Sequence, residues 1–218
     1  RMAGRYKGVP VFWAVGDNQA SFFGAAARAE DGVCVNVGTG SQVSLFDKRE
    51  ISTSVGEIRP FVGNGNLYVQ ASLNGGKVYE RLAVFLEEIG NLFREKGSVE
   101  KKPDGYEMAQ LLGRQKEETD LRVYPSLYGF RGCSITDSPL AGTDLKAGFI
   151  ENLTEANFHP GDLVRAYVGG MAAELHGMYM KFPEALRSGR KKIIASGNGI
   201  RKNELLRQEI EKQFDLPL

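Results

Sequence analysis

Residues 33–46, with the sequence VCVNVGTGSQVSLF, contain two short runs of β-forming residues joined by a glycine-rich turn. Branched apolar side chains on both sides of the turn predict a β-hairpin with strands at 33–37 and 42–46. The turn Gly38-Thr39-Gly40 lets backbone N–H groups approach a ligand without an intervening Cβ. Such a turn suits a phosphate group, although the same tripeptide also occurs in ordinary turns.

Length and composition indicate a globular protein with a real core. The chain has 218 residues, 42% of them hydrophobic, enough for one large domain or two small ones. The 28 Lys and Arg side chains nearly balance 27 Asp and Glu, so the formal charge of +1 gives no argument for nucleic acid or a membrane surface. No apolar run approaches the ~20 residues of a membrane-spanning helix. Cys34 and Cys133 are far apart, which fits a reducing, cytoplasmic setting better than a disulfide framework.

A second small-residue turn precedes this hairpin. Residues 9–15 are almost continuously apolar and predict a buried strand, which ends at Gly16-Asp17-Asn18-Gln19 before a helix at 20–28. Asp17 either caps this helix or places a carboxylate in the crevice where open α/β sheets bind ligands.

A third turn lies at 72–76, after a second predicted hairpin with strands at 57–62 and 67–71. An amphipathic helix is predicted at 77–96. Asn74, Gly75 and Gly76 stand at its start, where unpaired N–H groups and the helix dipole favour an anion. A Gly-Gly pair also serves as a simple connector, so both interpretations stay open.

The polar stretch 97–120 carries charge runs around a short helix at 106–112, and we expect a solvated surface without a site. Short strands are predicted at 121–124 and 147–150, and Arg131 in the loop between them is a weak candidate ligand contact.

The last third of the chain begins with a long predicted helix at 162–182, whose methionine and aromatic spacing is typical of a core helix. Its histidine has no ligand partners at suitable spacing, so no metal site is predicted. A strand at 191–195, the turn Ser196-Gly197-Asn198-Gly199 and a helix at 202–214 follow. Strand, glycine turn and helix start together form an arrangement that receives a phosphate or a nucleotide.

Four of these motifs occur in a familiar order: Gly16-Asp17-Asn18-Gln19-Ala20, Val37-Gly38-Thr39-Gly40, Ala71-Ser72-Leu73-Asn74-Gly75-Gly76, and Ser196-Gly197-Asn198-Gly199 through Asn203 to Gln208. Over nearly the whole chain they resemble the C-terminal domain of the FGGY carbohydrate kinases. The runs ASLNGG and RKNELLRQ, the latter followed by Leu-Pro, are most similar to the members that phosphorylate sedoheptulose. The resemblance implies an α/β fold: a ribonuclease-H-like domain of the actin-like ATPase type, with a mixed β-sheet flanked by helices.

The resemblance also implies roles for individual residues. Asp17 would be the catalytic base that takes the proton from the sugar hydroxyl, and Asn18 and Gln19 would contact the sugar with it. The nucleotide would be bound by residues of the three glycine turns: Gly38, Thr39 and Gly40 around the β- and γ-phosphates, Asn74, Gly75 and Gly76 beside the phosphates, and Gly197, Asn198, Gly199 and Asn203 at the adenosine. The implied cofactors are ATP and Mg²⁺, with the ion bridging phosphates.

By the same resemblance, residues 1–218 form a C-terminal nucleotide-binding domain that is incomplete and lacks its N-terminal domain. The start at Arg1, without an initiator methionine, also suggests a piece of a longer protein. We expect this piece alone to be inactive. Many relatives have Gly-Glu-Arg where this chain has Gly129-Phe130-Arg131, which weakens any contact inferred for Arg131.

The expected function of the whole protein is ATP-dependent phosphorylation of a ketose hydroxyl, with sedoheptulose as the first candidate. Xylulose, ribulose and glycerol remain alternative substrates, and a non-catalytic actin-like nucleotide-binding module is an alternative of another class. The retained Asp17 argues against that module. The expected partners are ATP, a sugar and the missing N-terminal domain, with homo-oligomers left open and neither nucleic acid nor a membrane among them.

Overall fold

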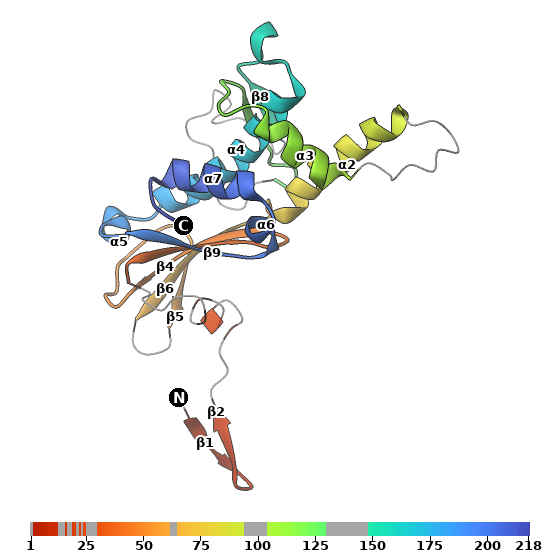
Figure 1. Ribbon diagram of the computed structural model, residues 1–218. Coiled ribbons are helices and arrows are strands. Elements are labelled where there is room, and N and C mark those ends of the chain that lie inside the picture. Colours follow the sequence, from red (N-terminus) through yellow and green to blue (C-terminus); the bar gives the residue numbers. More distant parts are fainter. Residues whose placement is uncertain are drawn as a thin grey trace.

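A five-stranded mixed sheet forms the centre of the computed structural model, which describes residues 2–12, 16, 19–20, 22, 24, 30–61, 65–93, 104–129 and 148–218 (Figure 1). The strands lie in the order β5-β6-β4-β3-β9. Their bounds are β3 Gly32–Val37, β4 Ser41–Asp47, β5 Glu57–Pro60, β6 Asn66–Ser72 and β9 Lys192–Ser196. Strands β3 to β6 pair antiparallel, as the two predicted hairpins require, and β9 runs parallel to β3.

Alternation along β3 explains how the sheet is buried on both faces. Val33, Val35 and Val37 pack into the main core with the helices, whereas Cys34 joins a smaller cluster with Phe22 on the other face. Successive side chains of a strand point to opposite faces, so the near-continuous apolar run is the expected pattern for a strand covered on both sides.

The helices of the main core lie together on one side of the sheet (Figure 1). They are α2 Gly76–Leu92, α3 Gly105–Arg114, α4 Pro160–Met180 and α7 Glu204–Phe214. Helix α4 confirms the predicted core helix, since its Val164, Val168 and Leu175 are almost fully buried. Among the described residues, no helix has both the length and the apolar character needed to cross a membrane.

The short helix predicted between the two charge runs is present as α3 and belongs to this packed layer, whereas Glu117 and Glu118 of the second charge run are exposed as expected. Asp104 begins the helix by accepting hydrogen bonds from the N–H groups of Tyr106 and Glu107. Ala109 is completely buried, and a Cβ on Gly105 would lie only 2.5 Å from the carbonyl carbon of Ala83 in α2. The small residues Gly105 and Ala109, which lie between the two charge runs in the sequence, let α3 approach its neighbours closely.

The smaller elements complete the described chain. Strands β7 Arg122–Tyr124 and β8 Phe149–Glu151 pair antiparallel beside α4, and the short helical segments are η1 Glu155–Asn157, α5 Glu184–Arg187 and α6 Asn198–Arg201.

The first hairpin stands apart from the sheet (Figure 1). It consists of β1 Met2–Tyr6 and β2 Val9–Phe12. The strand predicted at 9–15 is therefore present over its first part, but its predicted burial is wrong, since Val9 is 63% and Phe12 65% exposed. An apolar run is buried only where another surface covers it, and the described residues supply none here. Residues 13–15 lie outside the described part of the chain.

Candidate functional site

The glycine corner after β9 rests directly on the end of β3. These two strands are parallel, with Asn36 opposite Ser196, so both end at the same edge of the sheet. Gly197 has a positive φ of 90°, and a Cβ on it would lie 2.6 Å from the carbonyl carbon of Val37. On Gly199, a Cβ would lie 2.5 Å from Cγ1 of Val37. Side chains at these positions would push the corner away from the sheet, which explains why glycine is needed at both.

The turn Gly38-Thr39-Gly40 is joined in turn to the start of α2. The N–H of Gly76 donates to the carbonyl of Gly38 at 2.7 Å, and the N–H of Lys77 donates to that of Thr39 at 3.4 Å. Unpaired N–H groups were predicted at this helix start, and for Gly76 that prediction is wrong. The turn itself caps the helix, so an anion at this corner would have to use other donors.

Those donors are the amides of the turn. Among the described residues, no hydrogen bond uses the N–H of Gly38, Thr39 or Gly40. Consecutive free amides in a turn form a concave positive surface that suits a phosphate. Thr39 is exposed, and a Cβ on Gly38 would meet nothing closer than Oδ1 of Asn36 at 3.7 Å, so a ligand can reach this turn.

The corners after β3 and β9 and the start of α2 open into one cavity of about 1000 Å³. This volume is at the upper end of the range for small-molecule sites and could hold a nucleotide. The lining residues are Asn36, Gly38, Thr39, Gly76, Lys77, Tyr79, Glu80, Tyr106, Gln110, Gly197, Asn198, Gly199, Lys202 and Asn203. The fold therefore brings together predicted residues from all three glycine turns.

A polar network lies on one wall of this cavity. Nε2 of Gln110 donates to the hydroxyl of Tyr79 at 2.9 Å and to Oδ1 of Asn203 at 3.0 Å. Asn203 is 1% exposed, and the same Oδ1 caps α7 by accepting from the N–H of Leu206 at 3.1 Å. Its Nδ2 has no hydrogen-bond partner among the described residues. A buried donor left unpaired costs about 1–3 kcal/mol, so an acceptor on a bound ligand would be favoured here.

The charges in the cavity come from residues that the sequence analysis missed. Lys77 and Lys202 supply cations, and Glu80 is the carboxylate among the lining residues. Both lysines could have been found from the sequence because each is next to a predicted site residue: Lys77 follows the Gly75-Gly76 pair, and Lys202 directly precedes Asn203. Burial raises the pKa of the Tyr79 hydroxyl, which therefore stays protonated and neutral near pH 7.

Two further residues of the wall, Tyr106 and Gln110, lie on α3, in the stretch expected to carry no site. The packing of α3 on α2 brings them to the cavity, and no local pattern indicated it. The rings of Tyr79 and Tyr106 lie 5.7 Å apart, so the two helices present an aromatic surface here.

Glu80 is the one carboxylate among the described residues that line the cavity, which limits how the protein could hold a metal ion. In the described part of the chain, no group of three or more His, Cys, Asp or Glu side chains could hold one. Mg²⁺ is commonly bound through substrate phosphates, water and only one or two carboxylates. Glu80 is compatible with such partial coordination, so a magnesium ion would have to enter with the phosphates.

Other predicted residues lie outside the lining of this cavity. Gly40 and Gly75 pack against each other behind the turn, and Asn74 is buried with its amide bonded to protein groups. Nε2 of Gln19 donates to the carbonyl of Pro60 at 3.0 Å, at the end of β5. Three predicted residues lie outside the described part of the chain: Asp17, Asn18 and Arg131.

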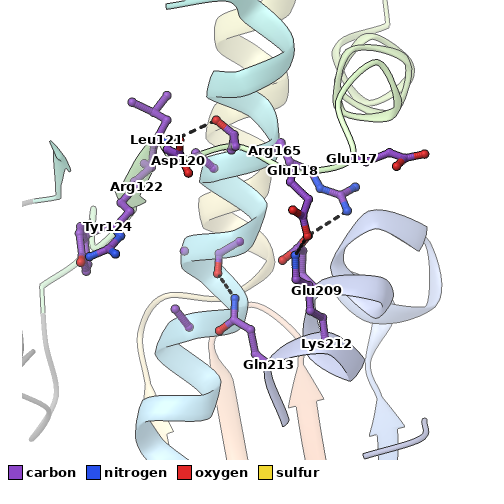
Figure 2. A pocket seen from close by; sticks show the side chains of 16 residues that line it. Glu117, Glu118, Asp120, Leu121, Arg122, Tyr124, Arg165, Glu209, Lys212 and Gln213 are labelled. Carbon is purple, nitrogen blue, oxygen red and sulfur yellow. Dashed lines mark hydrogen bonds and ion pairs between the residues drawn. The ribbon is translucent and has the colours of Figure 1, made fainter. Parts of the chain in front are cut away.

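A second cavity, of about 600 Å³, lies between β7, α4 and α7 (Figure 2). Its charges are largely paired with one another: Arg165 with Glu209 at 3.0 Å, and Lys212 with Glu118 at 2.7 Å. It contains none of the residues predicted from the sequence. Because the ion pairs neutralise each other, this cavity presents less free positive charge to an anion than the glycine-lined one.

Comparison with known sequences gives two related enzymes, although no protein-family model matches the chain. Sedoheptulokinases from Mus musculus and Homo sapiens are each 25% identical to it over 219 residues. Each alignment covers 97% of this chain and 43% of the relative. The chain thus spans less than half the length of the curated relatives it matches.

Solved structures that are similar in fold include kinases of sugars and of glycerol. The xylulose kinase from Rhodospirillum rubrum matches with a TM-score of 0.72 and 16% identity, over 95% of this chain and 38% of that structure. The glycerol kinase from Plasmodium falciparum, solved with ADP, matches with a TM-score of 0.65 and 15% identity, over 94% and 38%. The resemblance to the FGGY carbohydrate kinases, and to sedoheptulokinase among them, is thereby confirmed, and the fold is that of an actin-like ATPase domain.

Proposed function

We propose that the full-length protein is an ATP-dependent carbohydrate kinase that transfers a phosphoryl group to a hydroxyl of a ketose, with sedoheptulose as the first candidate. The observation that carries this proposal is the convergence of three glycine turns on one cavity of about 1000 Å³. The chain covers 43% of its sedoheptulokinase relatives, so most sugar contacts would come from the remainder of the protein.

The turn Gly38-Thr39-Gly40 would bind the terminal phosphates of ATP. Its amides are not used by other described residues, and Lys77 stands beside it with a positive charge. Phosphoryl transfer needs little covalent help from a protein, and catalysis depends on positioning and on stabilising charge on the phosphate oxygens. A magnesium ion bound with the nucleotide would neutralise part of that charge, with Glu80 as the carboxylate able to help hold it.

The other wall of the cavity would bind the nucleoside. Gly197, Asn198 and Gly199 line this wall, and the two glycines let their corner lie directly on the end of β3. The unpaired Nδ2 of Asn203 would donate to an acceptor on the nucleoside, while Gln110 holds the other side of the same amide. Asn203, which the resemblance assigns to the adenosine site, would therefore act there as a hydrogen-bond donor.

Asp17 would be the catalytic base, an assignment that depends on the resemblance alone. As the sugar oxygen bonds to the γ-phosphorus, the bond from that phosphorus to the ADP oxygen breaks and Asp17 takes the hydroxyl proton. Asn18 and Gln19 would orient the sugar beside it. The carboxylate needs only hydrogen-bond reach to the hydroxyl.

A coupled assay of ADP formation by the full-length protein tests the proposal with sedoheptulose, xylulose, ribulose and glycerol. We expect turnover with a ketose, fastest with sedoheptulose. ATP binding without turnover on any of these acceptors would contradict it and favour a non-catalytic nucleotide-binding module.

A further inference from the structure

Glu174, on α4, is a partly buried carboxylate with a specific set of partners. Its Oε1 accepts a hydrogen bond from Oγ of Ser72 and another from Nδ2 of Asn74, at 3.1 Å. Both partners are buried, with 8% and 5% of their surface exposed. A buried carboxylate is costly unless donors satisfy it, so these bonds hold Glu174 and its partners in one arrangement.

Asn74 extends this network to a third segment of the chain. Its backbone N–H donates to Oγ of Ser72 at 3.0 Å. Its side-chain Nδ2 also donates to the carbonyl of Gly129 at 3.0 Å, and its Oδ1 accepts from the N–H of Tyr128 at 3.1 Å. Through Asn74, Glu174 is therefore linked both to the connection between β6 and α2 and to the segment containing Tyr128 and Gly129.

The connection between β6 and α2 sets the position of the glycine turn. A Cβ on Gly40 would lie 2.6 Å from the carbonyl oxygen of Ser72, so these two backbones are in contact. Gly76, at the other end of the connection, donates to the carbonyl of Gly38. A displacement of residues 72–76 would therefore move the turn at both Gly38 and Gly40, because each of them is in direct contact with this connection.

We propose that Glu174 is a positioning residue for the phosphate-binding turn: through Ser72 and Asn74 it holds the β6–α2 connection against Gly38 and Gly40. This inference rests on the proposed function, since it assigns that turn to the phosphates of ATP. Glu174 is not among the residues that line the cavity, so it acts through its partners and not on the ligand.

The kinetic test uses the full-length protein with the variants Glu174→Ala and Glu174→Gln. We expect Glu174→Ala to lower kcat/KM for ATP about ten- to a hundredfold, because small misplacements of reacting groups have effects of that size. KM for the sugar should stay near its wild-type value. Glu174→Gln keeps an acceptor oxygen for Ser72 and Asn74 and should recover most of the loss.

Glu209 provides a matched control. It is also a helical glutamate, 8% exposed, but it pairs with Arg165 beside the second cavity. Glu209→Gln should change thermal stability and leave kcat/KM for ATP unchanged. Equal losses of kcat/KM in Glu209→Gln and Glu174→Ala would overturn the inference, because both would then reflect general destabilisation.

Hydrogen exchange provides a readout that does not depend on turnover. In Glu174→Ala without substrates, peptides covering 74–78, whose amides bond to Ser72, to the turn and within the helix start, should exchange faster than in wild type, while β9 exchanges at the same rate. Unchanged exchange in those peptides would overturn the inference even if the wild type is an active kinase. Conversely, an inactive wild type with the expected exchange pattern would count against the proposed function alone. If Glu174→Ala does not fold, Ser72→Ala removes one donor and is measured in the same way.

Discussion

Gly75 lies directly against Gly40: a Cβ built on Gly75 would come within 2.7 Å of the Cα of Gly40. One of these residues precedes α2 and the other ends the turn between β3 and β4. The two backbones therefore meet with no side chain between them, which is why the turn can accept hydrogen bonds from the start of the helix. Glycine at these positions is needed for packing as well as for access by a ligand.

Gly75→Ala should separate the helix start from the turn. Inserting a methyl group into a filled space typically costs about 1–3 kcal/mol of unfolding free energy, and here it would also displace the phosphate donors. We expect a lower Tm and a weaker affinity for ATP, measured by thermal unfolding and by calorimetry on the full-length protein. Gly177→Ala in α4 is the control, because a Cβ there would meet nothing within 4 Å. A Gly75→Ala variant with wild-type ATP affinity would contradict the assigned role of the corner.

Asn203 allows capping and ligand binding to be separated. Asn203→Asp keeps an oxygen that can cap α7 and accept from Gln110, but it replaces the unpaired Nδ2 donor. We expect ATP affinity to fall about tenfold, the equivalent of one lost hydrogen bond, while α7 stays capped.

Asn203→Ala removes both functions, so it should lower ATP affinity and also cost about 0.5–2 kcal/mol of stability. Unfolding curves with and without ATP distinguish the two effects. If Asn203→Asp binds ATP as tightly as wild type, the Nδ2 group is not a nucleotide contact.

Stability should depend on pH through Glu174. Burial raises its pKa above the ordinary value of 4.5, even though Ser72 and Asn74 donate to it. The folded state then binds the proton more tightly than the unfolded state, so this stabilising contribution is present below about pH 4.5 and is lost as the pH rises through the folded-state pKa. Glu174→Gln cannot ionise, so its Tm should rise relative to wild type between pH 4.5 and pH 8. A Tm difference that does not vary with pH would show that the carboxylate of Glu174 ionises as easily in the folded protein as in the unfolded chain.

Cys34 should be inert in the folded protein. Burial raises the pKa of its thiol to about 11, and it is only 7% exposed in β3. Since the thiolate is the reactive form, a thiol reagent at pH 8 should leave Cys34 unmodified until the protein is unfolded. In a Cys133→Ser variant, Cys34 is the only cysteine left in these 218 residues, so any modification found in them is at Cys34. Rapid modification under native conditions would mean that β3 opens readily.

Much of the fold could be predicted because its elements have strong local patterns. The hairpins of β3–β4 and β5–β6 follow from alternating or branched apolar runs with glycine turns, and helices α4 and α7 follow from apolar spacing. The exposure of β2 could not be predicted in the same way, because an apolar strand is buried only if another surface covers it. The packing of α3 was missed because its apolar face is short, consisting of Met108, Ala109 and Leu112, and because the close approach at Gly105 has no apolar signal.

The candidate site shows the same division. The glycine turns were visible in the sequence because they interrupt regular elements, and the fold brings them to one cavity. The contribution of Gln110 was not visible, since only the packing of α3 places it beside Tyr79 and Asn203. Asn74 had the right position in a motif, but its side chain is bonded to Glu174 and to a distant loop, which no local pattern reveals.

Asp17→Asn tests the assignment of the catalytic base. An amide cannot accept the proton from the sugar hydroxyl, so kcat should fall about 10²–10⁴-fold in the coupled assay with the full-length protein. The dissociation constant for ATP should stay near wild type, because the base acts on the sugar and not on the nucleotide.

Asp104→Asn is the matched control for the same chemical change. Asp104 caps α3 through its side chain, and asparagine caps helices equally well, so neither stability nor kcat should change. Normal turnover by Asp17→Asn would remove Asp17 from the mechanism, whereas a parallel loss of ATP binding would indicate that the substitution disturbs the whole site. A loss of kcat with ATP binding retained is the outcome that a base specific to the sugar requires.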